Sequence, residues 1–264
     1  EDIYKPYILL NGEYVPVVVN NSEELAEALD FAPSIYLTSG VYELTSTLNI
    51  NRPVILSGSD MAEVTLDASS FNSYAIAITV SDVEINNVTL LNGEQYGFKV
   101  SGPTVIENIT MENVTATGLG SGTESWTGFD FNSVNNITLT NVTSEDSKKF
   151  GFAFTNSNNV VVTDMYASGN GWGDVNISAW DHAGYSQPVG TVDNIIFNGV
   201  AQLAGGFVQL ETNNVTDGIT GVDGVITGVV FEPSTGYVAS DQFAKFASDD
   251  TQIAWALVYT VPES

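Results

Sequence analysis

The chain has 264 residues, with 32 Asp and Glu against 6 Lys and Arg, which gives a formal net charge of −26. Nucleic acids are bound through Lys and Arg, so this balance disfavours a nucleic-acid-binding protein. The sequence contains no Cys, which excludes a disulfide scaffold and thiol catalysis. No apolar run reaches the roughly 18 residues that a membrane-spanning helix requires. With 43% hydrophobic residues, the chain can bury a core.

The N-terminal region predicts two kinds of element. Residues 1–21 contain apolar runs and are predicted to add strands outside the regular part of the fold. Residues 22–30 indicate a short helix with Ser22 as the N-cap. Glu23 and Glu24 would occupy its first turn, where carboxylates interact favourably with the helix dipole. We expect this helix to cover the open end of the core that follows.

The central region is an internal repeat of short segments with strand-like alternation. Five segments align without gaps and carry Asn, Asp or Gly at their sixth position. They begin at Asp82, Asn108, Asn136, Asn159 and Asn194. Between them lies a second set of segments, which begin at Gly97, Gly128, Gly151, Asp174 and Phe207. Such short units, repeated in one direction, bury every apolar face only if the chain coils.

Coiling predicts an all-β fold, a right-handed parallel β-helix of roughly seven to nine coils, with strands stacked about 4.8 Å apart. The alternation then assigns columns of side chains that recur from coil to coil. The two inward columns are Ile85, Met111, Leu139, Val162 and Phe197, and Val88, Val114, Val142, Met165 and Val200. The outward column is Thr89, Thr115, Thr143, Tyr166 and Ala201.

The sixth position of the repeat predicts a structural ladder. Its members are Asn87, Asn113, Asn141, Asp164 and Gly199, the residue types that best tolerate a left-handed backbone at a bend. Stacked amides can also hydrogen-bond along the axis. Five of the chain's eight N-x-[ST] sequons fall on this ladder or on the parallel column at Asn108 and Asn136. We therefore expect glycans, where present, at Asn20 or Asn176.

Four segments near the start of the chain carry a family resemblance. They are residues 22–30, 35–42, 48–58 and 64–67, and they resemble the opening of pectate-lyase-like β-helix proteins. The resemblance runs from about residue 22 to about residue 228 and implies the fold. It implies no single function, because this fold hosts lyases, hydrolases, epimerases, spikes and coat proteins. The Gly-His-Gly and Arg-Ile-Lys motifs of the related pectin hydrolases are absent, so that family's site carries over to no residue.

Two groups of residues could carry carbohydrate chemistry. Lys99 is predicted to point outward in a column with Asp130, Ala153, Asn176 and Gln209, which could face a sugar. Further along, Trp172, Asp174 and Trp180 place aromatic rings beside carboxylates, which suits sugar binding. The same region holds Asp181, His182 and Tyr185, a set that could abstract a proton from a sugar. For each group, ordinary surface or loop packing is the simpler alternative.

The C-terminal region is predicted to close the other end of the solenoid. Residues 241–247 indicate a short amphipathic helix and residues 253–261 a strand. The predicted organisation is thus a strand extension over 1–21, a β-helix over 22–235 with its capping helix over 22–30, and a cap or assembly segment over 236–264.

These observations favour an extracellular, self-assembling structural or adhesive subunit, secreted after removal of a signal peptide. The absent catalytic motifs and the apolar terminal segments favour it. One alternative is a lyase or C5-epimerase acting on an acidic polysaccharide, and another is a non-catalytic carbohydrate-binding module. The expected partner is a second copy of the chain, with polysaccharide as a further ligand. No cofactor is required, although the many carboxylates could bind calcium.

Overall fold

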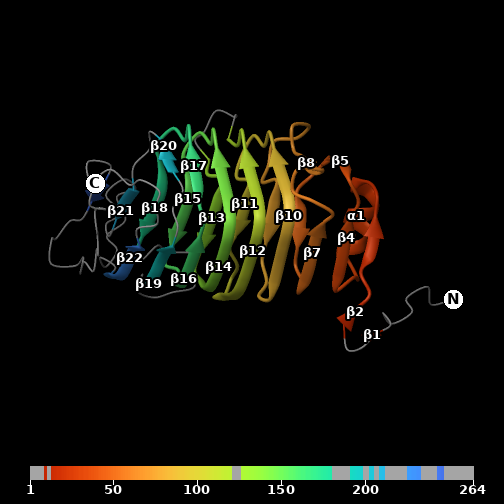
Figure 1. Cartoon of the computed structure of the whole chain (residues 1–264), viewed down its shortest axis with the longest axis horizontal. Helices are drawn as coiled ribbons and strands as arrows, with labels where there is room; N and C mark the ends of the chain where they lie inside the picture. Colours follow the sequence, from red (N-terminus) through yellow and green to blue (C-terminus); the bar gives the residue numbers. More distant parts are fainter. Residues whose placement is uncertain are drawn as a thin grey trace, which may run out of the picture.

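The computed structural model describes residues 9–10, 13–120, 126–179, 191–198, 202–204, 208–211, 225–232 and 243–246. Within these residues the chain is a right-handed parallel β-helix, so the predicted fold is confirmed (Figure 1). Successive coils lie side by side along one axis, and two long sheets follow that axis. No helix in the described part of the chain is long and apolar enough to span a membrane.

The first long sheet has 13 strands, which pair in parallel. Its main path is β22 (Val225–Glu232), β19 (Thr191–Asn198), β16 (Asn158–Thr163), β14 (Val134–Glu145), β12 (Ile106–Thr117), β10 (Val83–Leu91), β7 (Val54–Gly58), β4 (Ser34–Leu37) and β3 (Val17–Val19). Four strands extend it beside this path: β5 (Gly40–Glu43), β8 (Val64–Asp67), β17 (Tyr166–Ser168) and β20 (Gln202–Ala204).

Within the described residues, the second long sheet has 8 strands, which pair in parallel. In order they are β23 (Phe243–Phe246), β21 (Val208–Glu211), β18 (Gly173–Ser178), β15 (Phe150–Thr155), β13 (Phe129–Asn132), β11 (Phe98–Val100), β9 (Ile76–Ile78) and β6 (Leu48–Ile50). The predicted segments at 97, 128, 151, 174 and 207 thus supply consecutive strands of this sheet.

The core lies between the two sheets and follows the predicted columns. Ile85, Met111, Leu139, Val162 and Phe197 pair in register on five successive coils, and each is fully buried. The second inward column also forms, from Val88 through Met165. Its last predicted member, Val200, lies outside the described residues, and so does Ala201, the last predicted member of the outward column.

Phenylalanine side chains fill the core beneath the eight-stranded sheet. The rings of Phe98, Phe129 and Phe152 stack nearly parallel, with centroids 4.9 and 4.7 Å apart. Phe131 and Phe154 form a second stack at 5.3 Å. Because identical side chains recur at the spacing of the coils, each ring packs against its own counterpart. Burying such a ring contributes about 1.5–3 kcal/mol.

The predicted ladder forms as expected. Asn87, Asn113, Asn141 and Asp164 all have left-handed backbones, with φ between 50° and 56°. Asn113 Nδ2 donates to Asn87 Oδ1 at 2.8 Å, and Asn141 Nδ2 donates to Asn113 Oδ1 at 2.7 Å. Gly199, the predicted fifth member, lies outside the described residues. The side chains of Asn87, Asn113 and Asn141 thus form a chain of hydrogen bonds along the solenoid axis.

A second ladder runs parallel to the first at the opening bend of each repeat. Its members are also left-handed, with φ between 54° and 61°. They are Asp82, Asn108, Asn136, Asn159 and Asn194, linked in that order by side-chain hydrogen bonds of 2.7 to 3.4 Å. The sequons on both ladders therefore record coil geometry.

The N-terminal end differs from the prediction in two respects. Helix α1 (Ser22–Leu29) forms, but its N-cap is Asn21, whose side chain accepts a hydrogen bond from the Glu24 N–H at 2.9 Å. The prediction of Ser22 was wrong by one residue, because Asn and Ser cap equally well. In addition, β3 pairs with β4 inside the 13-stranded sheet, whereas β1 (Leu9–Leu10) and β2 (Glu13–Tyr14) form a separate antiparallel pair.

At the C-terminal end, the helix predicted over residues 241–247 is wrong for Phe243–Phe246. These residues form β23, which pairs in parallel with β21. A four-residue segment fits helical and strand periodicity equally well, and pairing with the preceding coil decides the outcome. The strand predicted over residues 253–261 lies outside the described residues.

Candidate functional site

The outer face of the eight-stranded sheet carries the predicted column. Lys99, Asp130, Ala153, Asn176 and Gln209 pair in register on five successive coils. Lys99, Asp130, Ala153 and Asn176 lie between buried core residues along their strands, so these four side chains point away from the core. The predicted outward direction is therefore confirmed for these four residues. The side chains are not freely exposed, however, because Asp130 and Asn176 are each only 5% accessible.

An ion pair lies within this column. Lys99 Nζ contacts Asp130 Oδ2, and Asn132 Nδ2 donates to the same oxygen at 2.9 Å. Lys99 Nζ also lies 4.5 Å from the ring centroid of Tyr96, a cation–π distance. The two charges are largely removed from water, so truncation of either would leave the other buried and unpaired. The pair thus provides a fixed polar centre on this face with no net charge.

Asn176 places an unused donor on the same face. Its Oδ1 accepts a hydrogen bond from Ser178 Oγ at 2.8 Å. Its Nδ2 is buried and has no hydrogen-bond partner. A buried amide donor without a partner costs about 1–3 kcal/mol.

A row of aromatic side chains crosses the coils beside this column. The rings of Tyr74 and Tyr96 meet edge to face at 5.5 Å, and those of Tyr96 and Trp126 at 4.6 Å. Main-chain hydrogen bonds connect Trp126 to the next two coils. The main-chain N–H of Lys149 donates to the Trp126 carbonyl, and the main-chain N–H of Trp172 donates to the Lys149 carbonyl. Lys149 Nζ lies 5.0 Å from the Trp172 ring. We call Tyr74, Tyr96, Trp126 and Trp172 the aromatic row.

The aromatic row joins the polar column at Tyr96, which contacts Lys99. Trp172, at 52% exposure, is its most accessible ring, and Tyr74, Tyr96 and Trp126 are half-buried. Rings on neighbouring coils, beside amide and charged groups, offer both an apolar surface and hydrogen-bonding groups. Such a surface suits an extended ligand that is itself apolar on one face and polar at its edges.

Of the aromatic row, sequence reasoning identified Trp172 and missed the other three. The signal was present, since Tyr74 and Tyr96 each stand two residues before a strand of the eight-stranded sheet. Trp126 stands three residues before its strand, which displaces it from a simple alignment.

Asp174, which sequence reasoning grouped with Trp172, lies apart from the surface. It is fully buried at the start of β18, and its Oδ1 accepts a hydrogen bond from Asn170 Nδ2 at 2.9 Å. Asn170 also donates to the Ser144 carbonyl at 3.2 Å. Asp174 therefore belongs to a buried polar cluster that holds the bend before β18.

Several predicted site residues lie outside the described residues: Trp180, Asp181, His182 and Tyr185. Their catalytic and binding roles stay predictions.

Of the two expected glycan sites, Asn20 is exposed and hydrogen-bonds Glu24, whereas Asn176 is buried on β18. The described residues contain no group of three or more His, Asp or Glu placed to hold a metal ion.

Comparison with solved structures gives a clear likeness. A variant of the catalytic domain of GH87 alpha-1,3-glucanase, in complex with tetrasaccharides, superposes with a TM-score of 0.55 and 15% identity. The match covers 82% of this chain and 45% of that one. This chain has the β-helix fold of that domain. The same domain in complex with nigerose gives a TM-score of 0.53 and 13% identity over the same shares.

At these identities the likeness establishes the fold and nothing finer. The resemblance to pectate-lyase-like proteins stays a prediction. The chain spans less than half the length of the solved chains that it matches. No protein-family model matches this chain, and no curated protein matches it either.

Proposed function

We propose that this chain is a carbohydrate-binding β-helix that holds a neutral polysaccharide along the aromatic row. The observation that carries the proposal is the set of aromatic rings on neighbouring coils, joined through Tyr96 to the Lys99–Asp130 pair. The same proposal includes an extracellular location, where neutral polysaccharides are found.

Stacking gives the physical basis of binding. A pyranose ring presents a face of C–H groups, which packs on an aromatic ring, and hydroxyl groups at its edge. Coils repeat about every 4.8 Å, which is close to the length of one sugar unit. A chain of sugars lying along the axis would therefore meet a new ring or polar group at each step.

Charge favours a neutral ligand. The chain carries a net charge of −26, and Asp130 neutralises Lys99 within the column. An acidic polysaccharide would be repelled at low salt, whereas a glucan would not. The solved β-helix domains of similar fold are named for alpha-1,3-glucan cleavage, which makes alpha-1,3-linked oligosaccharides the first ligands to test.

The test is calorimetric titration of the protein with alpha-1,3-linked glucose oligosaccharides and, for comparison, oligogalacturonate. We expect Trp126→Ala and Trp172→Ala each to weaken glucan binding by roughly fivefold, since stacking contributes on the order of 1 kcal/mol per ring. Tyr36→Ala, an exposed aromatic on β4 in the other sheet, should leave binding unchanged. If the unaltered protein binds no neutral glycan, the proposal is wrong.

A specific observation keeps the structural-subunit function as a second candidate. The N-terminal coils expose Val18 at 55%, Val41 at 63% and Ile55 at 39% on the 13-stranded sheet. Among the described residues this sheet ends at β3, an edge strand that pairs with β4 on one side only. Exposed apolar side chains near a free sheet edge favour association. Sedimentation velocity at high concentration tests this candidate, and a clean monomer with calcium present would exclude it.

A further inference from the structure

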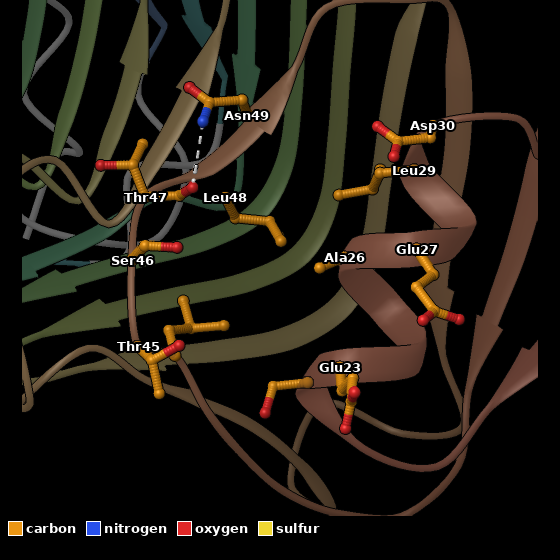
Figure 2. Close-up of a pocket in the computed structure, with 12 residues that line it drawn as sticks. Glu23, Ala26, Glu27, Leu29, Asp30, Thr45, Ser46, Thr47, Leu48 and Asn49 are labelled. Atoms are coloured by element: carbon orange, nitrogen blue, oxygen red, sulfur yellow. Dashed lines mark hydrogen bonds between the residues drawn. The ribbon is translucent and has the colours of Figure 1, made fainter.

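A groove lies at the N-terminal end of the solenoid, away from the aromatic row. It is an open hollow of about 720 Å³ between helix α1 and the segment from Leu44 to Asn49, and we call it the end groove. Figure 2 shows Ala26 of α1 and Leu48 of β6 pointing toward one another across it. Because Ala26 is small and exposed, the helix leaves space beside β6.

The end groove adjoins an unpaired sheet edge. Among the described residues, strand β6 is the last strand of the eight-stranded sheet and pairs only with β9. The Leu48 N–H donates to the Ala75 carbonyl at 2.9 Å, and the Thr79 N–H donates to the Ile50 carbonyl at 3.0 Å. In a parallel ladder alternate residues face alternate sides, so the main-chain N–H and C=O of Asn49 point to the free side.

The free edge is only lightly protected. Asn49 Nδ2 donates to the Thr47 carbonyl at 3.1 Å (Figure 2). Within the described part of the chain, no hydrogen bond involves the main-chain N–H or C=O of Asn49. Proteins usually cover such an edge with a charged side chain, a proline or another element. Here α1 flanks the edge, and the end groove separates the two. An added strand would lie about 4.8 Å from β6, within this space.

Charge identifies the class of occupant. Glu23, Glu27 and Asp30 line the helical side of the end groove, and all three are exposed. None of them forms an ion pair within the described part of the chain. A second copy of this chain would bring a net charge of −26 against this acidic side. An extended peptide carrying Lys or Arg is the complementary partner.

We propose that the end groove binds an extended cationic peptide, which adds a strand to the free edge of β6. Main-chain hydrogen bonds to Asn49 supply the strand pairing, and Glu23 and Glu27 select for positive charge. This interaction is independent of glycan binding at the aromatic row.

Fluorescence anisotropy of the full chain with a labelled peptide of alternating Val and Lys residues tests the proposal. Asn49→Pro removes the main-chain donor at an edge position where proline is tolerated, and we expect it to weaken binding at least about tenfold. Glu23→Gln combined with Glu27→Gln should weaken binding and reduce its salt dependence. The charge-matched control, Glu43→Gln with Glu112→Gln, alters exposed acids outside the groove and should bind normally.

Three results would overturn the proposal. One is equal binding of a main-chain N-methylated peptide of the same charge, since that peptide cannot pair as a strand. Another is no binding of the unaltered peptide to the unaltered protein. The third is concentration-dependent self-association that Asn49→Pro abolishes, because the occupant would then be a second copy. If Asn49→Pro fails to fold by circular dichroism, Ala26→Leu, which fills the groove from the helical side, replaces it with the same expected loss.

Discussion

At the residue scale, asparagine has two roles in this chain that no other side chain combines. It tolerates the left-handed backbone at a bend, and its amide both donates and accepts along the axis. Asn113 does both, since it donates to Asn87 and accepts from Asn141. A glycan on the Asn113 amide nitrogen would occupy the atom that binds Asn87. The ladder sequons are therefore structural, whatever the modification state at Asn20.

Substitutions at Asn113 separate these two roles. Asn113→Gly keeps the left-handed backbone but loses two hydrogen bonds, which should cost about 1–3 kcal/mol. Asn113→Ala loses the same bonds and adds the left-handed penalty, roughly 1 kcal/mol more. Urea unfolding of the two variants and the unaltered protein measures the difference. If Ala is as stable as Gly, the backbone conformation is not what selects Asn here.

A second feature at the residue scale is the pH-dependent pair of hydrogen bonds between Asn20 and Glu24 at the N-terminus of α1. The Asn20 N–H donates to Glu24 Oε2 at 2.8 Å, and the Asn20 side chain adds a second bond. These bonds favour the carboxylate and hold the pKa of Glu24 below its ordinary value, against a small opposing effect of desolvation. The stabilisation is present above the pKa of the unfolded state and is lost as pH falls through the lower, folded value.

We therefore expect Glu24→Gln to lower stability at neutral pH and to have progressively less effect in acid. Thermal unfolding of the variant and the unaltered protein over this pH range measures the gap between them. NMR titration of Glu24 in the folded chain provides the control. A pKa at or above that of a Glu in an unfolded peptide would contradict the assignment of the cap.

At the element scale, the columns of the fold were predictable because each coil repeats the last. A residue that points inward on one coil has an apolar counterpart at the same position on the next coil. Five apolar residues at equivalent positions predict an inward column more firmly than any one of them does alone. Residues 243–246 belong to the eight-stranded sheet, but the repeat did not reveal them as a strand, because their sequence does not repeat the pattern of β21. Their helical prediction rested on local periodicity alone, and pairing between coils outweighed it.

The phenylalanine stack is the element-scale test of coil-to-coil packing. Phe129 lies between Phe98 and Phe152 and is fully buried, so Phe129→Ala leaves a cavity that opens on two neighbours. We expect a loss of about 3–5 kcal/mol, and a smaller loss for Phe129→Leu, which refills part of the space. Guanidinium unfolding monitored by circular dichroism measures both. A loss below about 1 kcal/mol for Ala would mean that the coils adjust to close the cavity.

At the scale of the whole molecule, the direction in which a strand residue points was predictable from the sequence, and the solvent exposure of its side chain was not. The period of two placed Lys99, Asp130 and Asn176 on the outer face, as the structure has them. It could not indicate that Asp130 and Asn176 are buried there, because alternation along a strand carries no information about what covers a sheet. The aromatic row joins residues from different coils and bends, so it emerged only when the coils were stacked.

Charge is the property of the whole molecule that most directly affects its stability. A chain with a net charge of −26 repels itself when compact, because its 6 Lys and Arg can offset only a few of its 32 Asp and Glu. Salt shortens the screening length from about 30 Å at 0.01 M to about 8 Å at 0.15 M. Repulsion between exposed carboxylates on neighbouring coils then weakens, while the buried apolar columns are little affected. We expect the unfolding temperature to rise by about 2–4 °C per kcal/mol of repulsion relieved.

Differential scanning calorimetry in sodium chloride over this range measures the rise. The matched control replaces Glu43 and Glu112, both exposed and outside the proposed sites, with Lys, which lowers the net negative charge. That variant should start from a higher unfolding temperature and gain less from salt. A fall in unfolding temperature as salt is added would mean that attractive pairs outweigh the repulsion.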